Sequence, residues 1–388
     1  MPDNMLIVQG GGPTAVFNAS LAAVIRERQA QRPGASIFGA RFGMQGLAHG
    51  DLIDLTGLSN DALQQMRSSP GAALGSSRFA PSDAHLDASV RLLRERGIDK
   101  IVFLGGNGTM GGALKFGSFC ESRNVEVQIM GSPKTIDNDI ASTDRCPGYG
   151  SAARFVAQST LDLAADIRSL HQPVSIFETL GRDVGWLSAA ASLAKDNEDD
   201  APHVVCVPEV PFDLKRFLDA IANSVAKLGW AMAVVSEGIS YADGTPVFQQ
   251  VLPSGGKTPV RPLIGGVAQH LSGLVAQHLG LRCRSEKPGL IGRSAASDIS
   301  PQDLDDAEIT GRECVRALSR GETGQMVSLR PLVSGSSEGL GLVPLVNAAG
   351  PRKELPAAWL TDGSIAVNET FRAYALPLVG ELRRSRYL

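Results

Sequence analysis

The stretch that decides the fold is SPKTIDNDI, Ser132–Ile140, which follows the apolar run VQIMG, 127–131. It contains a lysine, a threonine and two aspartates within six positions. Pro133 and Asn138 would suffice to turn the chain, so these additional polar groups exceed what a solvent-exposed turn needs. In open α/β sheets, ligands bind at the carboxyl ends of strands. We therefore predict that 132–140 is a ligand-binding loop after a buried strand.

Short apolar runs alternate with amphipathic segments along most of the chain, which predicts βαβ units and parallel sheets of the α/β class. The runs are continuously apolar, as expected of strands covered by helices on both faces. The predicted strands are 5–9, 35–40, 100–106, 127–131, 174–179, 203–208 and 231–238. The predicted helices are 81–96, with Ser82 as the N-cap, 151–170, 214–228 and 266–279.

The chain is long enough for two domains, since it has 388 residues, of which 43% are hydrophobic. Counting strands places the domain change near residue 150. We expect a larger domain over 1–150, to which a segment near 265–325 returns, and a smaller domain over 151–264. The segment 326–388 is poorly periodic and is expected to have mixed structure. The Gly-, Ser- and Pro-rich patch 252–262 is predicted to be a surface loop.

Composition argues against nucleic-acid and membrane partners. The net charge is −3 and aromatic residues make up 5% of the chain, so neither a basic field nor a base-stacking surface is expected. No apolar stretch approaches the roughly 20 residues of a membrane span. The N-terminus lacks the basic region of a signal peptide, and the five cysteines are scattered. We expect a cytoplasmic protein with reduced thiols.

Two glycine-rich loops follow predicted strands and lead into helices. They are QGGGPTAVFNAS, 9–20, and LGGNGTMGGA, 104–113. Backbone N–H groups at such helix starts can hold phosphate oxygens, although neither loop has the Walker A or GxGxxG spacing. Asn107 adds a carbonyl oxygen, and Thr109 adds a hydroxyl that either contacts the ligand or caps the helix.

Together with ETLGRDVGW, 178–186, these loops indicate phosphoryl transfer. That reaction needs a donor held by backbone amides, cations on the transferred group and a carboxylate near the attacking hydroxyl. Asp137 is the candidate general base and Asp139 a carboxylate on the metal side. Lys134 and Arg182 are placed to supply positive charge where negative charge develops.

Four motifs give the chain a resemblance to the phosphofructokinase family, from residue 5 to about 320. They are TIDND (135–139), SSRF (76–79), LGR (180–182) and RCRSEKPGLIGRS (282–294). The resemblance implies two Rossmann-like three-layer α/β/α domains, the larger binding the phosphoryl donor and the smaller the sugar phosphate. It implies transfer to the 1-hydroxyl of fructose 6-phosphate, giving fructose 1,6-bisphosphate.

The resemblance also implies roles for individual residues. Asp137 would take the proton from the sugar hydroxyl, with Thr135, Lys134 and Arg182 as the other catalytic residues. The implied donor contacts are Gly11, Arg78, Gly106, Asn107, Gly108 and Thr109. The implied substrate contacts are Asp139, Leu180, Gly181, Glu237, Arg284 and Arg293. Mg²⁺ is the implied cofactor, held by Asn107 and Asp137. Since one arginine of the family reaches into a neighbouring subunit, Arg284 implies a homodimer or homotetramer with a shared active site.

The residues that distinguish the ATP-using from the diphosphate-using branch of the family disagree about the phosphoryl donor. Lys134 and the following CPGYGS, 146–151, resemble the branch of the family that uses diphosphate. That branch also has an aspartate at position 108, where it excludes the α-phosphate of a nucleotide, and this chain has Gly108. Because steric exclusion is harder to bypass than an added cation, we slightly favour ATP. Asn107 replaces the charged metal ligand of the ATP branch, which predicts weaker magnesium affinity.

The acceptor markers leave a second and a third hypothesis open. Leu290 stands where the family has a polar contact to the 6-phosphate, and Pro173 where a further arginine is expected. His171 or Lys287 could compensate. A diverged kinase for another sugar phosphate is therefore an alternative, and a non-catalytic metabolite sensor is another. The leading hypothesis requires that Asp137 and Arg182 face one cleft.

Overall fold

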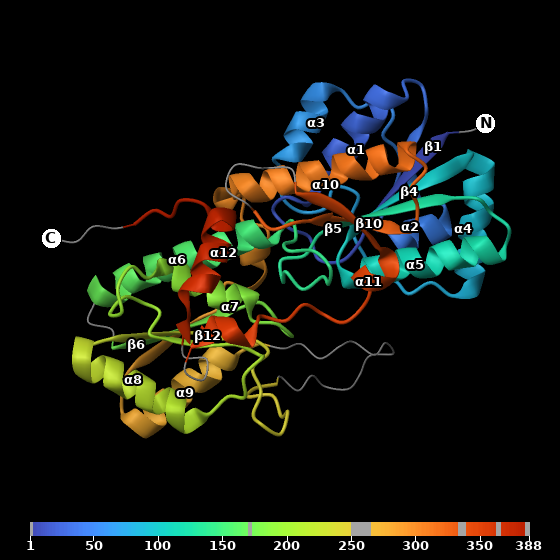
Figure 1. Ribbon diagram of the computed structural model, residues 1–388. Helices are drawn as coiled ribbons and strands as arrows, with labels where there is room; N and C mark the ends of the chain where they lie inside the picture. Colours follow the sequence, from blue (N-terminus) through green and yellow to red (C-terminus); the bar gives the residue numbers. More distant parts are fainter. Residues whose placement is uncertain (1–2, 170–172, 250–264, 333–338, 362–365, 385–388) are drawn as a thin grey trace. The chain divides into compact units, whose positions relative to one another are not determined.

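The computed structural model describes residues 3–169, 173–249, 265–332, 339–361 and 366–384. The predicted loop 252–262 and the compensating His171 lie outside these residues. The chain divides into two compact units. Unit 1 comprises Met1–Ser151 and Arg293–Lys353, and unit 2 comprises Ala152–Gly292 and Glu354–Leu388. Figure 1 shows both, with the sequence coloured from blue to red.

The sheet of unit 1 has a parallel centre and two antiparallel edges. Its strand order is β11-β10-β5-β4-β1-β2-β3. The parallel strands are β10 (Gln325–Leu329), β5 (Gln128–Pro133), β4 (Ile98–Gly105), β1 (Asn4–Gln9) and β2 (Ile37–Ala40). The antiparallel edge strands are β11 (Leu340–Pro344) and β3 (Leu52–Asp54). The carboxyl ends of β1, β4 and β5 therefore lie side by side.

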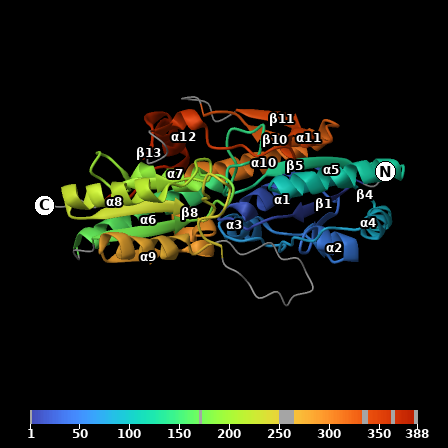
Figure 2. The same cartoon turned by 90° about the horizontal axis from the view of Figure 1, so that it is seen from below.

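Helices cover both faces of this sheet, as Figures 1 and 2 show. One layer contains α1 (Phe17–Gln31), α3 (Asn60–Arg67) and α10 (Pro301–Ser319). The other contains α2 (Met44–His49), α4 (Asp83–Arg96), α5 (Asn107–Ser122) and α11 (Leu345–Ala348). Alternate residues of β1 enter the two cores, with Met5 and Ile7 on one side and Leu6 and Val8 on the other. This double burial explains the continuously apolar strands.

Unit 2 repeats the three-layer plan on a smaller, parallel sheet of order β7-β8-β6-β9. Its strands are β7 (Val204–Cys206), β8 (Ala231–Ser236), β6 (Val174–Thr179) and β9 (Cys283–Glu286). The helices α8 (Leu214–Leu228) and α9 (Val267–Leu279) cover one face. The other is covered by α6 (Tyr149–Ser169), which belongs to unit 2 from Ala152 on, and by η1 (Ala191–Ala194).

Shorter elements complete both units. Unit 1 also has η3 (Ala296–Asp298), and η2 (Gly289–Arg293) ends at the first residue of its second segment. Unit 2 also contains α7 (Trp186–Ala190), η4 (Ala357–Trp359), a hairpin of β12 (Leu360–Thr361) and β13 (Ala366–Val367), and α12 (Glu369–Val379).

The predicted parallel α/β class and all seven predicted strands are present. Ser82 is the N-cap of α4, where its hydroxyl lies 2.9 Å from Nδ1 of His85. The helix α10 was not predicted from periodicity, because Asp303, Asp306 and Thr310 are polar residues on its buried face.

The two units differ from the expected domains at their later segments. The return to unit 1 was expected near 265–325, but α9 packs into the core of unit 2 and the return begins at Arg293. The segment 326–388 was placed in neither domain and was expected only to have mixed structure. Instead, its first part adds β11 and α11 to unit 1, and its last part belongs to unit 2.

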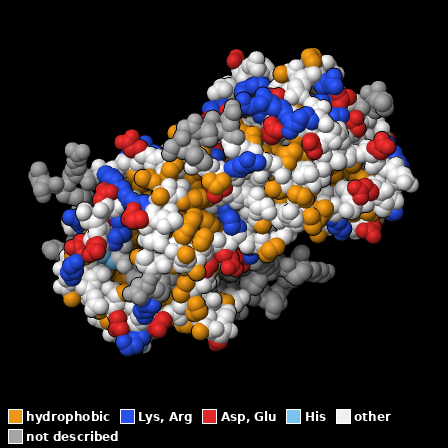
Figure 3. Space-filling model, in the orientation of Figure 1, with side chains coloured by type: hydrophobic (Ala, Val, Ile, Leu, Met, Phe, Trp, Pro, Cys, Tyr) orange, Lys and Arg blue, Asp and Glu red, His pale blue; other side chains and the backbone are white. Residues whose placement is uncertain are grey.

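Neither the described helices nor the visible surface indicates a membrane protein. No helix in the described part of the chain is long and apolar enough to cross a bilayer. Basic and acidic side chains are interspersed on the face shown in Figure 3, in keeping with the small net charge.

Candidate active site

Three loops of unit 1 meet at the carboxyl ends of β1, β4 and β5. Gly10 donates its N–H to Leu104 O at 2.9 Å, and Lys134 donates its N–H to Gly105 O at 2.9 Å. A Cβ atom at Gly10 or Gly105 would lie only 2.5 Å or 2.2 Å from Oγ1 of Thr109. Glycine is therefore required at both positions for the loops to approach each other.

Thr109 is a packing residue in the first turn of α5. The N-cap of that helix is Gly106, so the alternative that Thr109 caps the helix is wrong. The neighbouring Gly108 is exposed, and a Cβ atom there would have no other atom within 4 Å. The helix start consequently has open space at Gly108 and free backbone N–H groups in the first turn.

The side chain of Lys134 is buried beneath the first glycine loop. Its Nζ donates to Gly12 O at 2.7 Å and lies 4.6 Å from the centroid of the Phe17 ring. Burial lowers the pKa of Lys134 to about 8, while the charges of Asp137 and Asp139 oppose this shift. The lysine is thus a cation close to both aspartates, and its charge is lost at a lower pH than usual.

The loop shape that presents Asp137 is set by its neighbours. Asp137 is partly buried, and its N–H donates to Oγ1 of Thr135 at 3.1 Å. Asn138 has a φ of +54°, a left-handed conformation that asparagine tolerates better than most residues. Its Oδ1 accepts from the N–H of Cys146 at 3.0 Å. The tight turn at Asn138 separates the two aspartate side chains.

Two arginines border the same loops. A Cβ atom at Gly12 would lie 3.3 Å from Nη1 of Arg293, so this guanidinium lies against the first glycine loop. Burial and the charge of Arg78 lower the pKa of Arg293, whereas Asp137 opposes the shift. The resemblance implies a substrate contact for Arg293, and the structure places its guanidinium beside the first glycine loop of unit 1. Positive charge therefore collects around Asp137.

Asn107 carries an oxygen without a protein partner. Its Nδ2 donates to Asp139 O at 3.4 Å, while its Oδ1 is buried and has no hydrogen-bond partner among the described residues. Such an oxygen fits a Mg²⁺ ion, which takes few protein ligands and is otherwise held by phosphates and water. The described residues contain no group of three or more His, Cys, Asp or Glu side chains arranged for a metal.

A cavity of about 470 Å³ extends from the glycine loops of unit 1. Its polar end is formed by Gly11, Gly106 and Gly108, together with Arg78 and Lys115. Its apolar wall includes Met44, Phe79, Leu86 and Phe103. The sequence analysis missed Lys115, because a single lysine on a helix gives no signal of the cavity it borders.

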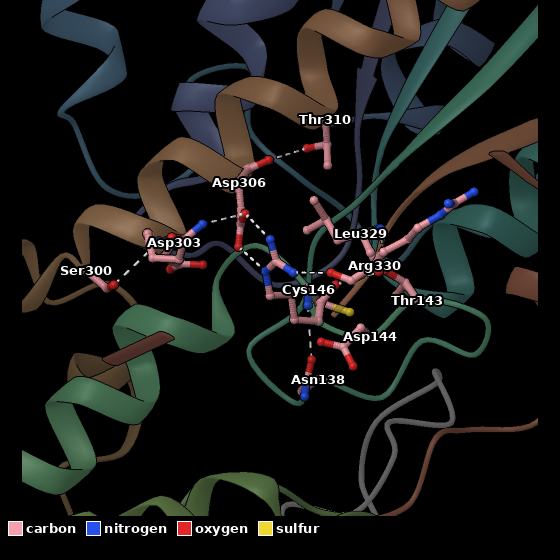
Figure 4. Close-up of polar contacts among 12 residues, drawn as sticks. Asn138, Thr143, Asp144, Cys146, Ser300, Asp303, Asp306, Thr310, Leu329 and Arg330 are labelled. Atoms are coloured by element: carbon pink, nitrogen blue, oxygen red, sulfur yellow. Dashed lines mark hydrogen bonds and ion pairs between the residues drawn. The ribbon is translucent and has the colours of Figure 1, made fainter. Parts of the chain in front are cut away.

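A buried polar network behind the loop ties it to α10, as Figure 4 shows. Arg145 donates to both carboxylate oxygens of Asp306, with Nε at 2.6 Å and Nη2 at 2.8 Å. One oxygen of Asp303 accepts from the N–H of Gly148 at 2.8 Å, and the other accepts from the N–H and hydroxyl of Ser151. Burial raises the pKa of Asp303 to about 6. These contacts hold the later part of the segment that follows the aspartates, from Arg145 to Ser151.

The second group of predicted residues lies in unit 2, at the carboxyl ends of β6 and β8. Gly181 has a φ of +115°, and its carbonyl accepts from the hydroxyl of Ser236. The N–H of Glu237 donates to Thr179 O at 3.0 Å. A Cβ atom at Gly238 would lie 1.7 Å from Arg182 O. Backbone contacts thus hold Leu180, Gly181 and Arg182 next to Glu237.

The charges in this group are mixed. Burial raises the pKa of Glu237, as does Glu178, whereas Arg182 and Lys287 oppose the shift. Nζ of Lys287 lies 3.1 Å from Oε1 of Glu178, whose carboxylate also accepts N–H groups of Gly266 and Ala268 at the start of α9. Lys287, expected to compensate at the 6-phosphate, is therefore engaged with a carboxylate.

The remaining predicted residues of unit 2 are on its surface. Arg284 is exposed on β9, an edge strand of the sheet. Leu290, in η2, has 63% of its surface exposed, and the adjacent Ile291 has 68%. Two large apolar side chains exposed together are unusual and mark a surface suited to contact with another molecule.

Comparison with known proteins identifies the family. The family model for phosphofructokinase matches residues 4–318. The chain belongs to the phosphofructokinase family. The predicted phosphofructokinase fold and the predicted enzyme class, a phosphotransferase with an alcohol acceptor, are confirmed by this membership.

Curated phosphofructokinase relatives differ in the donor and acceptor given in their names. The pyrophosphate–fructose 6-phosphate 1-phosphotransferase of Xanthomonas campestris pv. campestris is 34% identical, over 97% of this chain and 91% of that protein. A sulfofructose kinase of Alkalicoccus urumqiensis is 33% identical, over 83% of this chain and 82% of that protein. An ATP-dependent 6-phosphofructokinase of Mycobacterium bovis is 30% identical, over 92% of this chain and 98% of that protein.

A solved phosphofructokinase has the same fold along the whole chain. The pyrophosphate-dependent phosphofructokinase of Nitrosospira multiformis aligns with a TM-score of 0.89 at 28% identity. The alignment covers 100% of this chain and 94% of that one. The likeness therefore includes the C-terminal segment that lies beyond the matched family model.

Proposed function

We propose that this phosphofructokinase transfers a phosphoryl group from ATP to the 1-hydroxyl of fructose 6-phosphate. The observation that carries the proposal is the position of Asp137, which is bordered by Lys134 and Arg293 beside the glycine loops. A carboxylate surrounded by cations at a phosphate-binding edge suits a base that deprotonates a hydroxyl while it attacks a phosphate.

In the proposed reaction, Asp137 takes the proton of the sugar 1-hydroxyl as that oxygen attacks the terminal phosphorus of the donor. A bond forms between the sugar oxygen and phosphorus, and the bond between phosphorus and the bridging oxygen breaks. Lys134 and Arg293 stabilise the negative charge on the transferred group. We propose that Arg182 also stabilises the charge of the transferred group and that Glu237 binds sugar hydroxyls.

Mg²⁺ is the proposed cofactor, and its proposed protein ligands are Asn107, through its unpartnered Oδ1, and Asp137. When bound, the ion would neutralise charge on the donor phosphates. Because Asn107 contributes no charge, we expect weak binding of magnesium in the absence of the donor.

The preference for ATP is supported by the cavity next to the glycine loops. Diphosphate has no apolar part, whereas the apolar wall of Met44, Phe79 and Leu86 suits a nucleobase. The open space at Gly108 leaves room for an α-phosphate. Diphosphate is the second candidate donor, favoured by Lys134 and by the names of the Xanthomonas and Nitrosospira relatives.

Parallel assays with ATP and with diphosphate, using fructose 6-phosphate as the acceptor, test the donor. We expect the higher kcat/KM with ATP. The variant Gly108→Asp should lose most activity with ATP and keep its fold, because the added side chain meets no protein atom. Retained ATP use in this variant, or a higher kcat/KM with diphosphate in the wild type, would overturn the donor assignment.

Leu290 and the sulfofructose kinase relative favour a second candidate acceptor, a fructose carrying a different acidic group at carbon 6. An apolar side chain contributes no hydrogen bond to a 6-phosphate. The identity of the acidic group at carbon 6 is therefore the part of the acceptor that the sequence specifies least. A panel of fructose 6-phosphate, sulfofructose and other sugar phosphates decides between them by kcat/KM. Transfer to any of them eliminates the non-catalytic sensor.

We further propose a cytoplasmic homodimer or homotetramer in which Arg284 reaches the active site of a neighbouring subunit. The exposure of Arg284 on an edge strand and the apolar pair Leu290 and Ile291 support such a contact. Mixing the inactive variants Asp137→Asn and Arg284→Ala should restore part of the activity, since mixed assemblies would contain one intact site. A mixture as inactive as its components would reject the shared site.

A further inference from the structure

The C-terminal segment of unit 1, 339–353, lies beyond the part of the chain that the family model matches. It is anchored by β11, which pairs with β10, and by α11, whose Leu345 and Ala348 are buried in the core beside α5. The segment ends at Arg352 and Lys353, whose contacts with the loop of Asp137 have no counterpart in the sequence motifs.

Arg352 and Lys353 make four contacts with three residues of the loop. Nε of Arg352 lies 3.4 Å from Oδ2 of Asp139, and the N–H of Lys353 donates to Asp139 O at 2.9 Å. Nζ of Lys353 donates to Asp144 O at 2.6 Å and to Thr143 O at 3.2 Å. Main chain and side chain of Asp139 are therefore both held by this segment.

These contacts bear on the geometry of the site because Asp139 is buried and is separated from Asp137 by one residue. A buried carboxylate needs compensating charge and hydrogen bonds to keep one position. Its backbone carbonyl also accepts from Nδ2 of Asn107 at 3.4 Å, so a shift of Asp139 would move a proposed magnesium ligand as well.

We propose that Arg352 and Lys353 are positioning residues that hold the catalytic loop through Asp139 and the 143–144 backbone. The inference rests on the proposed function only in assigning catalysis to that loop. A variant of Arg352 can distinguish this role from a general structural one. The side chain of Arg352 is 42% exposed and fills no space in the core, so its removal leaves no cavity. Lys353, by contrast, is half-buried, and desolvation lowers its pKa.

Steady-state kinetics of Arg352→Ala, with the better donor and acceptor of the wild type, give the first test. We expect kcat to fall by about 10-fold to 100-fold with both KM values within about twofold, because misplaced reacting groups slow chemistry more than binding. Arg352→Lys should recover most of the loss. The control is Arg123→Ala, since Arg123 is similarly exposed and pairs with Asp87 on the surface. Wild-type kcat in Arg352→Ala would overturn the proposal.

Hydrogen–deuterium exchange gives a second test that does not depend on activity. Peptides covering 135–146 should exchange faster in Arg352→Ala than in the wild type and Arg123→Ala, while peptides from α1 remain unchanged. If the wild type phosphorylates no acceptor, the proposed function fails, but this measurement still decides whether Arg352 holds the loop. Unchanged exchange in 135–146 would refute the positioning role, and Arg352→Gln provides the same comparison if the alanine variant does not fold.

Discussion

The charged loops of the two units are held in different ways. In unit 1, the loop after β5 is fixed from behind by a buried ion pair, Arg145 with Asp306, and by the carboxylate of Asp303. In unit 2, the loop after β6 is fixed by close backbone contacts, in which Gly238 approaches Arg182 O and Ser236 holds the carbonyl of Gly181. The first arrangement depends on charge, whereas the second depends on the absence of a side chain.

This difference has a physical reason. The loop after β5 turns through Asn138 and runs on to Gly148 before α6 begins, so its backbone leaves the sheet and needs partners from another element. Asp303 and Asp306 on α10 provide them. The loop after β6 stays within reach of the neighbouring strand β8, so main-chain contacts suffice. The four predictions below test the two arrangements in order of decreasing effect.

The largest effect is expected from replacing Asp137, the carboxylate that the loop after β5 presents. Asp137→Asn removes the proposed base but keeps the size of the side chain, so kcat should fall by about 10²–10⁴-fold while both KM values change little. Steady-state kinetics measure this. Asp219→Asn, an exposed surface change on α8, is the control. Near-normal turnover of Asp137→Asn would show that Asp137 is not the general base.

The ion pair behind the first loop should be the larger contributor to stability. Asp306→Ala leaves Arg145 buried without its carboxylate, which should lower the free energy of unfolding by about 3–5 kcal/mol. Glu27→Gln breaks the more exposed pair with Arg316 and should cost at most about 1 kcal/mol. Urea titrations of the two variants measure the difference. Equal losses would show that the buried pair is no stronger a restraint than a surface pair.

The steric arrangement of the second loop is tested by adding one methyl group. Gly238→Ala places a Cβ where Arg182 O lies 1.7 Å away, so the backbone must move, at a cost of about 1–3 kcal/mol. Gly273→Ala, in α9 of the same unit, has open space and should instead stabilise the protein by about 0.5–1 kcal/mol. Thermal unfolding compares them, and kcat of Gly238→Ala reports the displacement of Arg182. A neutral Gly238→Ala would reject the steric account.

An effect no larger than that of Gly238→Ala is expected from pH, through the carboxylate of Asp303 behind the first loop. The pKa of Asp303 is raised to about 6 from its ordinary value of 3.8, so between these values the folded protein holds a proton that the unfolded chain releases. This stabilisation is complete below pH 3.8 and is lost as the pH rises through 6.

Asp303→Asn should remove this part of the pH dependence, which is of the order of 1–3 kcal/mol. Urea titrations of the wild type and the variant at several pH values between 4 and 7 measure it. Parallel curves for the two proteins would show that Asp303 has an ordinary pKa in the folded state.

Much of the fold and of the site could be predicted because the relevant signals are local. The strands β1, β4 and β5 are continuous apolar runs, and the loops after them carry their functional groups within a few residues, as TIDND does. The glycines of these loops are equally local as a sequence signal, because they cluster directly after the apolar runs, at 10–12 and at 105, 106 and 108. Such patterns belong to one segment and need no knowledge of its partners.

Other features could not be predicted, because their signals are weak or misleading. Lys115 is an example, since a single lysine on a helix does not indicate the cavity that it borders. The helix α10 is another, since its buried face is interrupted by the aspartates that hold the loop. Polar residues in a buried face hide a helix from an analysis based on apolar periodicity.

The sequence alone determined that the chain forms parallel α/β layers with glycine-rich loops and a carboxylate at their strand ends, because local patterning and turn chemistry encode these features. Only the tertiary structure decided which residues hold the loop of Asp137 in place. Arg145 and Asp306 are 161 positions apart, and Thr143 and Lys353 are 210 apart. Contacts at such separations arise from the packing of elements against one another, and no spacing within a single segment records them.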